Sequence, residues 1–138
     1  MRTWLGIVLS SLIATSALAA GQQNTQLMDG SVARTAFTTG IDNREPMDNI
    51  GDALGNDSGE ITYFTDLRNL AGQTVTHRWQ YNGETMAEIG FNVGGDRWRV
   101  WSSKRLTSTW LGNWTVSVVN GDGQTLAEDT FVYQDSSM

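Results

Sequence analysis

Seven short β-favouring segments, separated by turn signals in a glycine-rich chain, constrain the fold more than any other feature of the sequence. Short β-favouring runs between turn signals are typical of strands. Seven of them within about 105 residues predict an antiparallel β-sandwich of immunoglobulin-like size. An OB-type barrel is the alternative, but it would need five longer strands. The expected strands cover residues 32–39, 61–67, 74–81, 85–93, 96–103, 113–119 and 125–133.

The turn between the third and fourth segments decides which side chains share a face. A two-residue turn at Asn82-Gly83 would place the apolar residues of these two segments on opposite faces of the sheet. A three-residue loop at residues 81–83 instead pairs Trp79 with Thr85 and brings the two apolar sets to one face. Because a one-residue slip would expose a whole apolar set to water, we expect the three-residue loop.

The next turn signal, Gly94-Gly95, predicts a two-residue hairpin in which Phe91 pairs with Trp98. The third to fifth segments are then expected to form one meander with a common core face. The last two segments are expected to form a hairpin, in which Leu126 and Phe131 share a face only if a bulge lies between them. The expected core face of the meander consists of His77, Trp79, Ala87, Ile89, Phe91, Val93, Trp98 and Val100.

A cationic and aromatic strip, GDRWRVWSSKR at residues 95–105, supplies the candidate functional site. Alternation along the strand turns Trp98 toward the core and leaves Arg97 and Arg99 on the opposite face. An exposed tryptophan beside arginines can stack on a sugar ring, while the guanidinium groups bind its carboxylate or phosphate. The alternative is an internal ladder in which arginines lie between aromatic rings and cap Glu88. The candidate ligand-binding residues are Arg78, Arg97, Arg99, Trp101 and Lys104.

The net charge of −6 is unevenly distributed along the chain. Residues 20–67 carry eight acids and two bases (−6), residues 68–105 carry three acids and six bases (+3), and residues 106–138 carry four acids and no base (−4). Because a strongly acidic chain is a poor general binder of polyanions, DNA and RNA are not expected partners. The locally basic segment can still bind carboxylates or phosphates, and arginine suits both.

The N-terminus has the pattern of a cleaved signal peptide. Arg2 precedes an apolar run at residues 4–14 that is too short to span a bilayer, and Ala17-Leu18-Ala19 fits a cleavage site. A short membrane anchor is the alternative. We therefore expect a periplasmic or extracellular protein with no transmembrane segment after cleavage. Its expected parts are a signal peptide at 1–19, a flexible leader at 20–30 and a β-sandwich domain at 31–135.

The chain contains no cysteine. An exported domain of this composition must therefore be held together by its core rather than by disulfides. The same absence excludes anchoring through a lipidated N-terminal cysteine. A domain of about 110 residues is large enough to fold on its core alone.

The residues with catalytic or metal-binding chemistry give little support for an enzyme. His77 is the single histidine and is expected to be a hydrogen-bonded core residue, since a metal site would need a second histidine or a cysteine. No G-x-S-x-G nucleophile motif is present. The acidic segment 41–60 does not match a calcium-binding loop and is expected to be solvated. Trp110 fits either an exposed loop aromatic or a plug at one end of the core. We expect no cofactor and no catalysis.

Four phrases of the sequence resemble the bacterial family called domain of unknown function 2914. They are FTTGIDNREP (37–46), YFTDLRNLAGQTVTHRWQYNG (63–83), FNVGGDRWRVWSSKRL (91–106) and GNWTVSVVNGDG (112–123), and the resemblance runs from about residue 33 to residue 133. It implies an immunoglobulin-like β domain that is exported or membrane-attached. It implies no reaction, because the family has no assigned activity.

Together these features predict an exported, non-enzymatic binding module. Its expected ligand is an anionic glycan of the cell envelope, bound through the cationic and aromatic face. The alternative is a protein-interaction or assembly module that docks an acidic partner, or a second copy whose 41–60 segment supplies the carboxylates. A hydrolase that depends on His77 is a third hypothesis.

Overall fold

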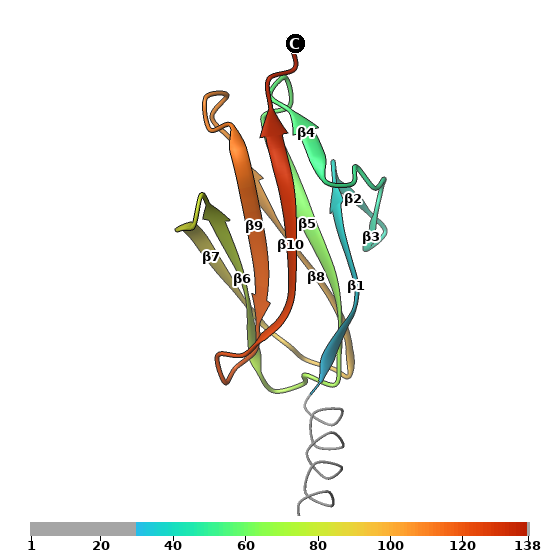
Figure 1. The fold of residues 1–138 in the computed structure, drawn as a ribbon. Coiled ribbons are helices and arrows are strands. Elements are labelled where there is room, and N and C mark those ends of the chain that lie inside the picture. Colours follow the sequence, from blue (N-terminus) through green and yellow to red (C-terminus); the bar gives the residue numbers. More distant parts are fainter. Residues whose placement is uncertain (1–29, 138) are drawn as a thin grey trace, which may run out of the picture. The chain divides into compact units, whose positions relative to one another are not determined.

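The computed structural model describes residues 30–137, and the domain that begins at Ser31 is a β-sandwich of ten strands (Figure 1). The predicted signal peptide, and residues 20–29 of the predicted leader, lie outside the described residues. Within residues 30–137 there is no helix, so this range holds no helix long and apolar enough to cross a membrane. The strands are β1 (Ser31–Thr38), β2 (Ile41–Asp42), β3 (Glu45–Pro46), β4 (Ala53–Gly55), β5 (Glu60–Arg68), β6 (Thr74–Tyr81), β7 (Glu84–Asn92), β8 (Arg97–Arg105), β9 (Gly112–Val119) and β10 (Thr125–Gln134).

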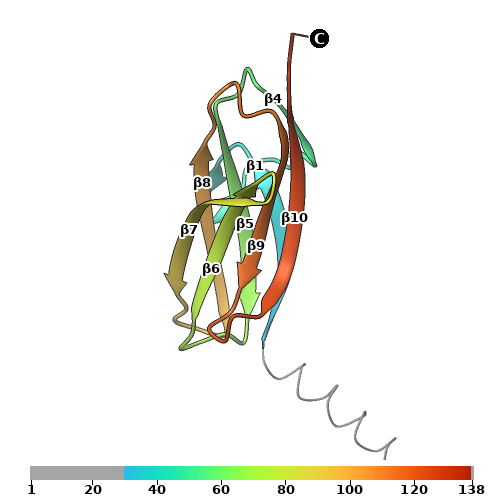
Figure 2. The ribbon, with the colours of Figure 1, turned by 60° about the vertical axis from the view of Figure 1, so that its left-hand side comes forward.

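All seven predicted strands are present, and the three short strands β2, β3 and β4 are additional. One layer of the sandwich is the sheet β1-β5-β8, and the other layer is the sheet β4-β10-β9-β6-β7 (Figure 2). Strands β2 and β3 form a separate two-stranded sheet. If the seven long strands are lettered A to G in chain order, the sheets are A-B-E and D-C-F-G. A constant-type immunoglobulin domain has A-B-E-D and C-F-G. The predicted immunoglobulin-like sandwich is therefore confirmed, with the fourth strand (β7) in the opposite sheet.

The predicted meander of β6, β7 and β8 is wrong, because β8 pairs with β5 in the other sheet. Residues 61–67 of β5 are all buried, and a strand buried on both faces belongs in the middle of a sheet. Strand β8 supplies its second neighbour, so Trp98 pairs with Leu67 and not with Phe91. Gly94 lies in the crossing between the sheets, where an added Cβ would approach the Trp98 ring to 3.0 Å.

The predicted three-residue loop between β6 and β7 is also wrong. Asn82 and Gly83 have φ angles of 49° and 85°, so they form the two-residue hairpin turn that requires two left-handed residues. Trp79 pairs with Ala87 rather than with its predicted partner, and Met86 is the extra residue of a bulge. The apolar residues of both strands still share one face. The extra residue of the bulge shifts the pairing by one position, which is the shift that the predicted three-residue loop would have given.

The core contains the residues predicted for it. Trp79 on β6 and Trp114 on β9 are both fully buried, and Leu126 is the bulged residue of the C-terminal hairpin. Of the eight predicted core-face residues, four are buried and four are partly buried against the core. The buried residues are His77, Trp79, Val93 and Val100, and the partly buried ones are Ala87, Ile89, Phe91 and Trp98.

A chain of side-chain hydrogen bonds crosses the core around His77. The Nδ1 atom of His77 lies 2.7 Å from Ser102 Oγ, and its Nε2 atom lies 3.1 Å from Thr65 Oγ1. Trp79 Nε1 donates to Ser102 Oγ at 3.0 Å, and Thr65 Oγ1 donates to the Val100 carbonyl at 3.3 Å. With the proton of His77 on Nε2, each of these groups has a partner. The network joins β6 to β5 and β8 in a domain that has no disulfide.

Candidate functional site

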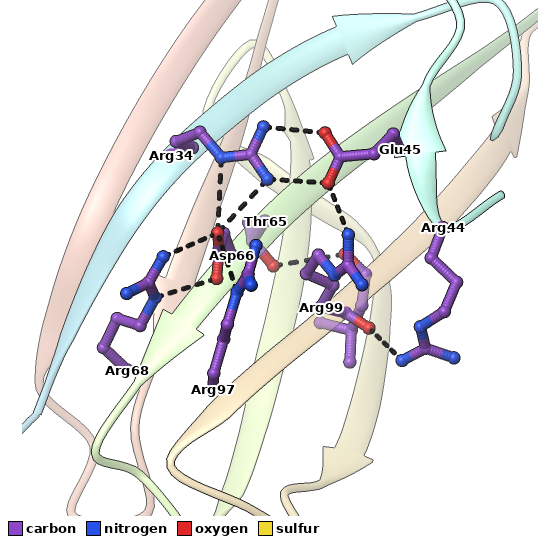
Figure 3. Close-up of polar contacts among 9 residues, drawn as sticks. Arg34, Arg44, Glu45, Thr65, Asp66, Arg68, Arg97 and Arg99 are labelled. Carbon is purple, nitrogen blue, oxygen red and sulfur yellow. Dashed lines mark hydrogen bonds and ion pairs between the residues drawn. The ribbon is translucent and has the colours of Figure 1, made fainter. Parts of the chain in front are cut away.

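Five arginines gather around two carboxylates on the outer face of the three-stranded sheet, and we call this set the arginine surface (Figure 3). Strand β1 contributes one arginine, β5 and β8 contribute three more, and the short β2–β3 hairpin covers the face with one arginine and one glutamate. Directly paired residues of neighbouring strands share a face, which brings these side chains together. The arginine surface consists of Arg34, Arg44, Arg68, Arg97 and Arg99 with Glu45 and Asp66.

Asp66 lies at the centre of the arginine surface and is inaccessible to solvent. Arg68 donates to both of its oxygens at 3.1 Å, and Arg34 donates to Oδ2 at 3.2 Å. The Nε atom of Arg97 lies 4.0 Å from the same oxygen. The hydrogen bonds from Arg68, and then those from Arg34, hold the pKa of Asp66 below its usual range despite the burial of the carboxyl. Asp66 is therefore ionised at neutral pH.

Glu45, on the β2–β3 hairpin, bridges two arginines of the arginine surface, Arg34 and Arg99. Arg34 donates to its two carboxylate oxygens at 2.8 Å each, in the fork-to-fork geometry of a bidentate pair. Arg99 donates to Oε2 at 2.6 Å. The hydrogen bonds from Arg34 and then from Arg99 lower the pKa of Glu45 to about 2. Glu45 is thus a permanently charged carboxylate that two strands of the sheet hold in place.

A bulge in β1 places Arg34 on this face. Val32 packs on the core, and in a regular strand a residue two positions later would point to the same side. The register shifts between Val32 and Arg34, so that Val32 pairs with Leu67 and Arg34 pairs with Asp66. The extra residue therefore turns Arg34 outward, toward the two carboxylates.

The charges within the arginine surface do not cancel. Four guanidinium groups pair with the two carboxylates, and Arg44 beside them is the fifth, which leaves a net charge of +3 for the set. Arg2 and Asp29 cancel outside the described residues, so residues 30–137 carry −6, and the remainder of the domain carries −9. Arg97 is exposed, with 59% of its side chain accessible, and it lies directly opposite Arg68, which is 40% accessible. These two guanidinium groups have donors free to face solvent.

Aromatic rings lie under the arginines on the same face. Phe64 is fully buried although it points away from the core, and the Arg34 guanidinium lies over its ring at 5.2 Å from the ring centre. Trp101 pairs with Phe64 across the strands and is partly buried, with Arg44 at 5.9 Å from its ring centre. The structure therefore contains stacked arginines and solvent-facing arginines on one surface. Of the arginines in the ladder hypothesis, Arg78 does pair with Glu88, whereas Arg99 pairs with Glu45.

The five predicted site residues do not share one face, because β8 belongs to the three-stranded sheet. Arg97 and Arg99 belong to the arginine surface, and Trp101 lies on the same sheet face under Arg44. Arg78 lies on the outer face of the five-stranded sheet, where its Nε donates to Glu88 at 2.8 Å. Lys104 lies at the end of β8 on the side of the core, and its ammonium group is 5.2 Å from the ring centre of Trp110.

Trp110 closes one end of the core and is itself partly buried. Its ring centre lies 5.9 Å from that of the buried Trp114, and its carbonyl accepts a hydrogen bond from Trp114 Nε1 at 3.1 Å. Of the two hypotheses for Trp110, this arrangement corresponds to the plug.

The acidic segment 41–60 is more ordered than the sequence predicts. It forms the β2–β3 hairpin and β4, and its Asp48 accepts hydrogen bonds from Thr38 Oγ1 at 2.7 Å and Thr39 Oγ1 at 2.6 Å. These bonds, first those from Thr38, lower the pKa of Asp48. Within the described residues, no group of three or more histidine, aspartate or glutamate side chains is placed to hold a metal ion.

Residues 72–133 match the family model described as "Protein of unknown function (DUF2914)". The resemblance to this family is confirmed. The DUF2914 match spans β6 to β9 and most of β10, whereas the predicted resemblance began near residue 33. Of the arginine surface, only Arg97 and Arg99 fall within the DUF2914 match. A comparison of the chain with curated proteins gives no match.

Proposed function

We propose that this protein is a non-enzymatic binding module whose arginine surface recognises an anionic glycan of the cell envelope. The observation that carries the proposal is the uncompensated charge of +3 on one sheet of a domain that is otherwise strongly acidic. A purely structural ion-pair cluster needs no such excess. An excess of guanidinium groups costs self-repulsion, which an anionic ligand would relieve.

The geometry of the exposed arginines supports this proposal. Arg68 and Arg97 are directly paired on neighbouring strands, and Arg34 is 44% accessible beside them. Planar guanidinium forks bind carboxylate and phosphate groups bidentately. An acidic body behind the cationic face would orient the protein with this face toward an anionic polymer. The envelope as the location rests on the predicted signal peptide.

The surroundings of His77 support a non-enzymatic protein. His77 and Ser102 are hydrogen-bonded like a base and a nucleophile, but both are buried in the core. Within the described residues, the hydrogen-bond partners of His77 are two hydroxyl groups and no carboxylate. Burial alone lowers the pKa of His77 to about 3. A base with this pKa, out of reach of substrate, is a poor general base at neutral pH.

The test is co-sedimentation of residues 20–138 with purified cell-wall sacculi at low and moderate salt. We expect the wild-type protein to pellet at low salt and to be released at moderate salt, because exposed charges are screened. The double variant Arg68→Ala/Arg97→Ala should remain in the supernatant at both salt concentrations. Failure of the wild-type protein to pellet at either salt would contradict the proposal.

An acidic protein partner is the second candidate function. Among the described strands β8 has one neighbour, β5, so the strand that carries Arg97 and Arg99 is an edge strand beside a cationic face. Edge strands can accept a strand from another chain. A second copy could supply carboxylates from segment 41–60, as the sequence suggested. Glu45 of that segment already pairs with arginines of its own chain, so another carboxylate of the segment would have to make the contact. Salt-sensitive self-association in analytical ultracentrifugation, without sacculus binding, would favour this candidate.

A further inference from the structure

We propose that Arg34 and Arg99 form a carboxylate subsite, which Glu45 of the same chain occupies in the free protein and which a carboxylated sugar occupies in the complex. This inference rests on the proposed function and names its ligand class. Glu45 makes three short charged hydrogen bonds at 2.6 to 2.8 Å, two from Arg34 and one from Arg99. The spacing of the two guanidinium groups therefore already fits a carboxylate.

The tip of the β2–β3 hairpin has few attachments to the sheet. The two strands have two residues each, and their ladder has only the pairs Ile41 with Pro46 and Asp42 with Glu45. Asn43 and Arg44 at the turn have φ angles of 53° and 63°. The left-handed conformation is uncommon for a residue such as arginine and stores strain.

The contacts of the tip with the sheet are ion pairs that water can reach. The Glu45 and Arg34 side chains are 40% and 44% accessible and Arg99 is 24% accessible, so a carboxylate from solution can compete with Glu45 for the same two guanidinium groups. Arg44 donates to the Arg99 carbonyl at 3.5 Å, the limit of a hydrogen bond. The base of the hairpin is fixed instead by the bond from Met47 N to the Gly40 carbonyl at 2.9 Å. The tip can lift while β1 and the base stay in place.

Displacement of the tip would uncover a site that suits a sugar acid. Arg34 and Arg99 would lose the Glu45 carboxylate that they hold (Figure 3). Trp101 would lose the Arg44 guanidinium that lies over its ring. Two guanidinium forks beside a tryptophan ring can bind the carboxylate of a uronic acid and stack on its pyranose ring. The inferred ligand is therefore a uronic-acid-type glycan.

The experiment measures binding of an oligogalacturonate to the full mature chain by isothermal titration calorimetry. The variant Glu45→Gln empties the subsite of its internal carboxylate. The matched control is Asp42→Asn, which removes the same charge from the same hairpin. Asp42 makes no ion pair among the described residues, so this change leaves the subsite as it is. We expect Glu45→Gln to bind about fivefold more tightly than Asp42→Asn. The methyl-esterified oligosaccharide, which has no carboxylate, should bind to neither variant.

Equal affinities of Glu45→Gln and Asp42→Asn would overturn the subsite, and so would a complete absence of binding to both variants. The sacculus experiment decides the proposed function separately, so that the two failures can be distinguished.

A second measurement of the subsite needs no variant. Saturation of the wild-type protein with the oligogalacturonate should shift the Nε–H resonances of Arg34 and Arg99 but not that of Arg78. Unchanged Arg34 and Arg99 resonances would also overturn the subsite.

Discussion

Two ionisable residues of this domain, His77 and Asp66, are equally inaccessible to solvent, but His77 is neutral and Asp66 is ionised at neutral pH. His77 lies in the core, and its hydrogen-bond partners are the hydroxyl groups of Thr65 and Ser102. Burial without a counter-charge keeps it neutral. Asp66 lies on the outer face of a sheet, and arginine side chains rather than the core cover it. Its pKa is lowered because these side chains donate charged hydrogen bonds.

The difference shows that inaccessibility alone does not predict what a polar residue does. The groups around His77 are satisfied within the core, so the network can stabilise the domain but has no donor left for a ligand. The groups around Asp66 carry more positive charge than the two carboxylates can neutralise. We therefore propose that the first region serves stability and that the second serves binding.

The largest effect on stability is expected for Ser102→Ala. This change removes the hydrogen-bond partner of Trp79 Nε1 and of His77 Nδ1, and both groups stay buried. An unsatisfied buried group costs roughly 1 to 3 kcal/mol, so the free energy of unfolding should fall by about 3 kcal/mol. Urea unfolding followed by tryptophan fluorescence measures it. A loss under about 1 kcal/mol would show that the network does not hold the sheets together.

A smaller loss is expected for Asp66→Asn. The change removes the central negative charge that Arg34 and Arg68 share, while the amide keeps the shape of the side chain. We expect a loss of about 2 kcal/mol, below the value for an ion pair buried on both sides, because both arginines remain partly exposed. The same urea experiment measures it, and an unchanged midpoint would mean that Asp66 does not organise the arginine surface.

The pH dependence of stability separates the two residues most clearly. The unfolded chain binds a proton on His77 near its ordinary pKa of 6.5, whereas the folded protein does so only near pKa 3. The free energy of unfolding should therefore fall as the pH drops below about 6.5, with a slope that approaches about 1.4 kcal/mol per pH unit.

Between about pH 6.5 and about pH 5 the change in the free energy of unfolding reports mainly on His77. Carboxyl groups with ordinary or lowered pKa values are still ionised in this interval and contribute little to the slope. The stability that depends on Asp66 is lost only at lower pH, as the pH falls through its lowered pKa. The control variant His77→Gln should have no slope in this interval. A wild-type protein without the slope would contradict a buried neutral histidine.

The strands of the fold are predictable from the sequence, but the pairing of the strands is not. Alternation and turn residues identify all seven long strands. The position of β5 in the middle of a sheet is hidden, because Thr62, Thr65 and Asp66 interrupt its apolar residues although all three are buried. Without that information, Gly94-Gly95 is indistinguishable from a hairpin turn.

The candidate site is predictable only where it is continuous in the sequence. Arg97, Arg99 and Trp101 stand in one strand and were predicted together. Arg34 and Glu45 come from other segments, and a bulge and a short hairpin bring them to the same face. A carboxylate and an arginine two residues apart on one strand, as in Asp66 and Arg68, are the local signal that could have extended the prediction.

The most direct test of the central claim compares sacculus binding by Arg97→Ala and Arg78→Ala. Both variants remove one arginine charge from an outer sheet face, but Arg97 lies on the arginine surface and Arg78 on the opposite sheet. Each should change the free energy of unfolding by less than about 0.5 kcal/mol, as exposed substitutions usually do. We predict that Arg97→Ala weakens pelleting while Arg78→Ala pellets like the wild-type protein. Equal binding by the two variants would contradict the assignment of ligand binding to the arginine surface.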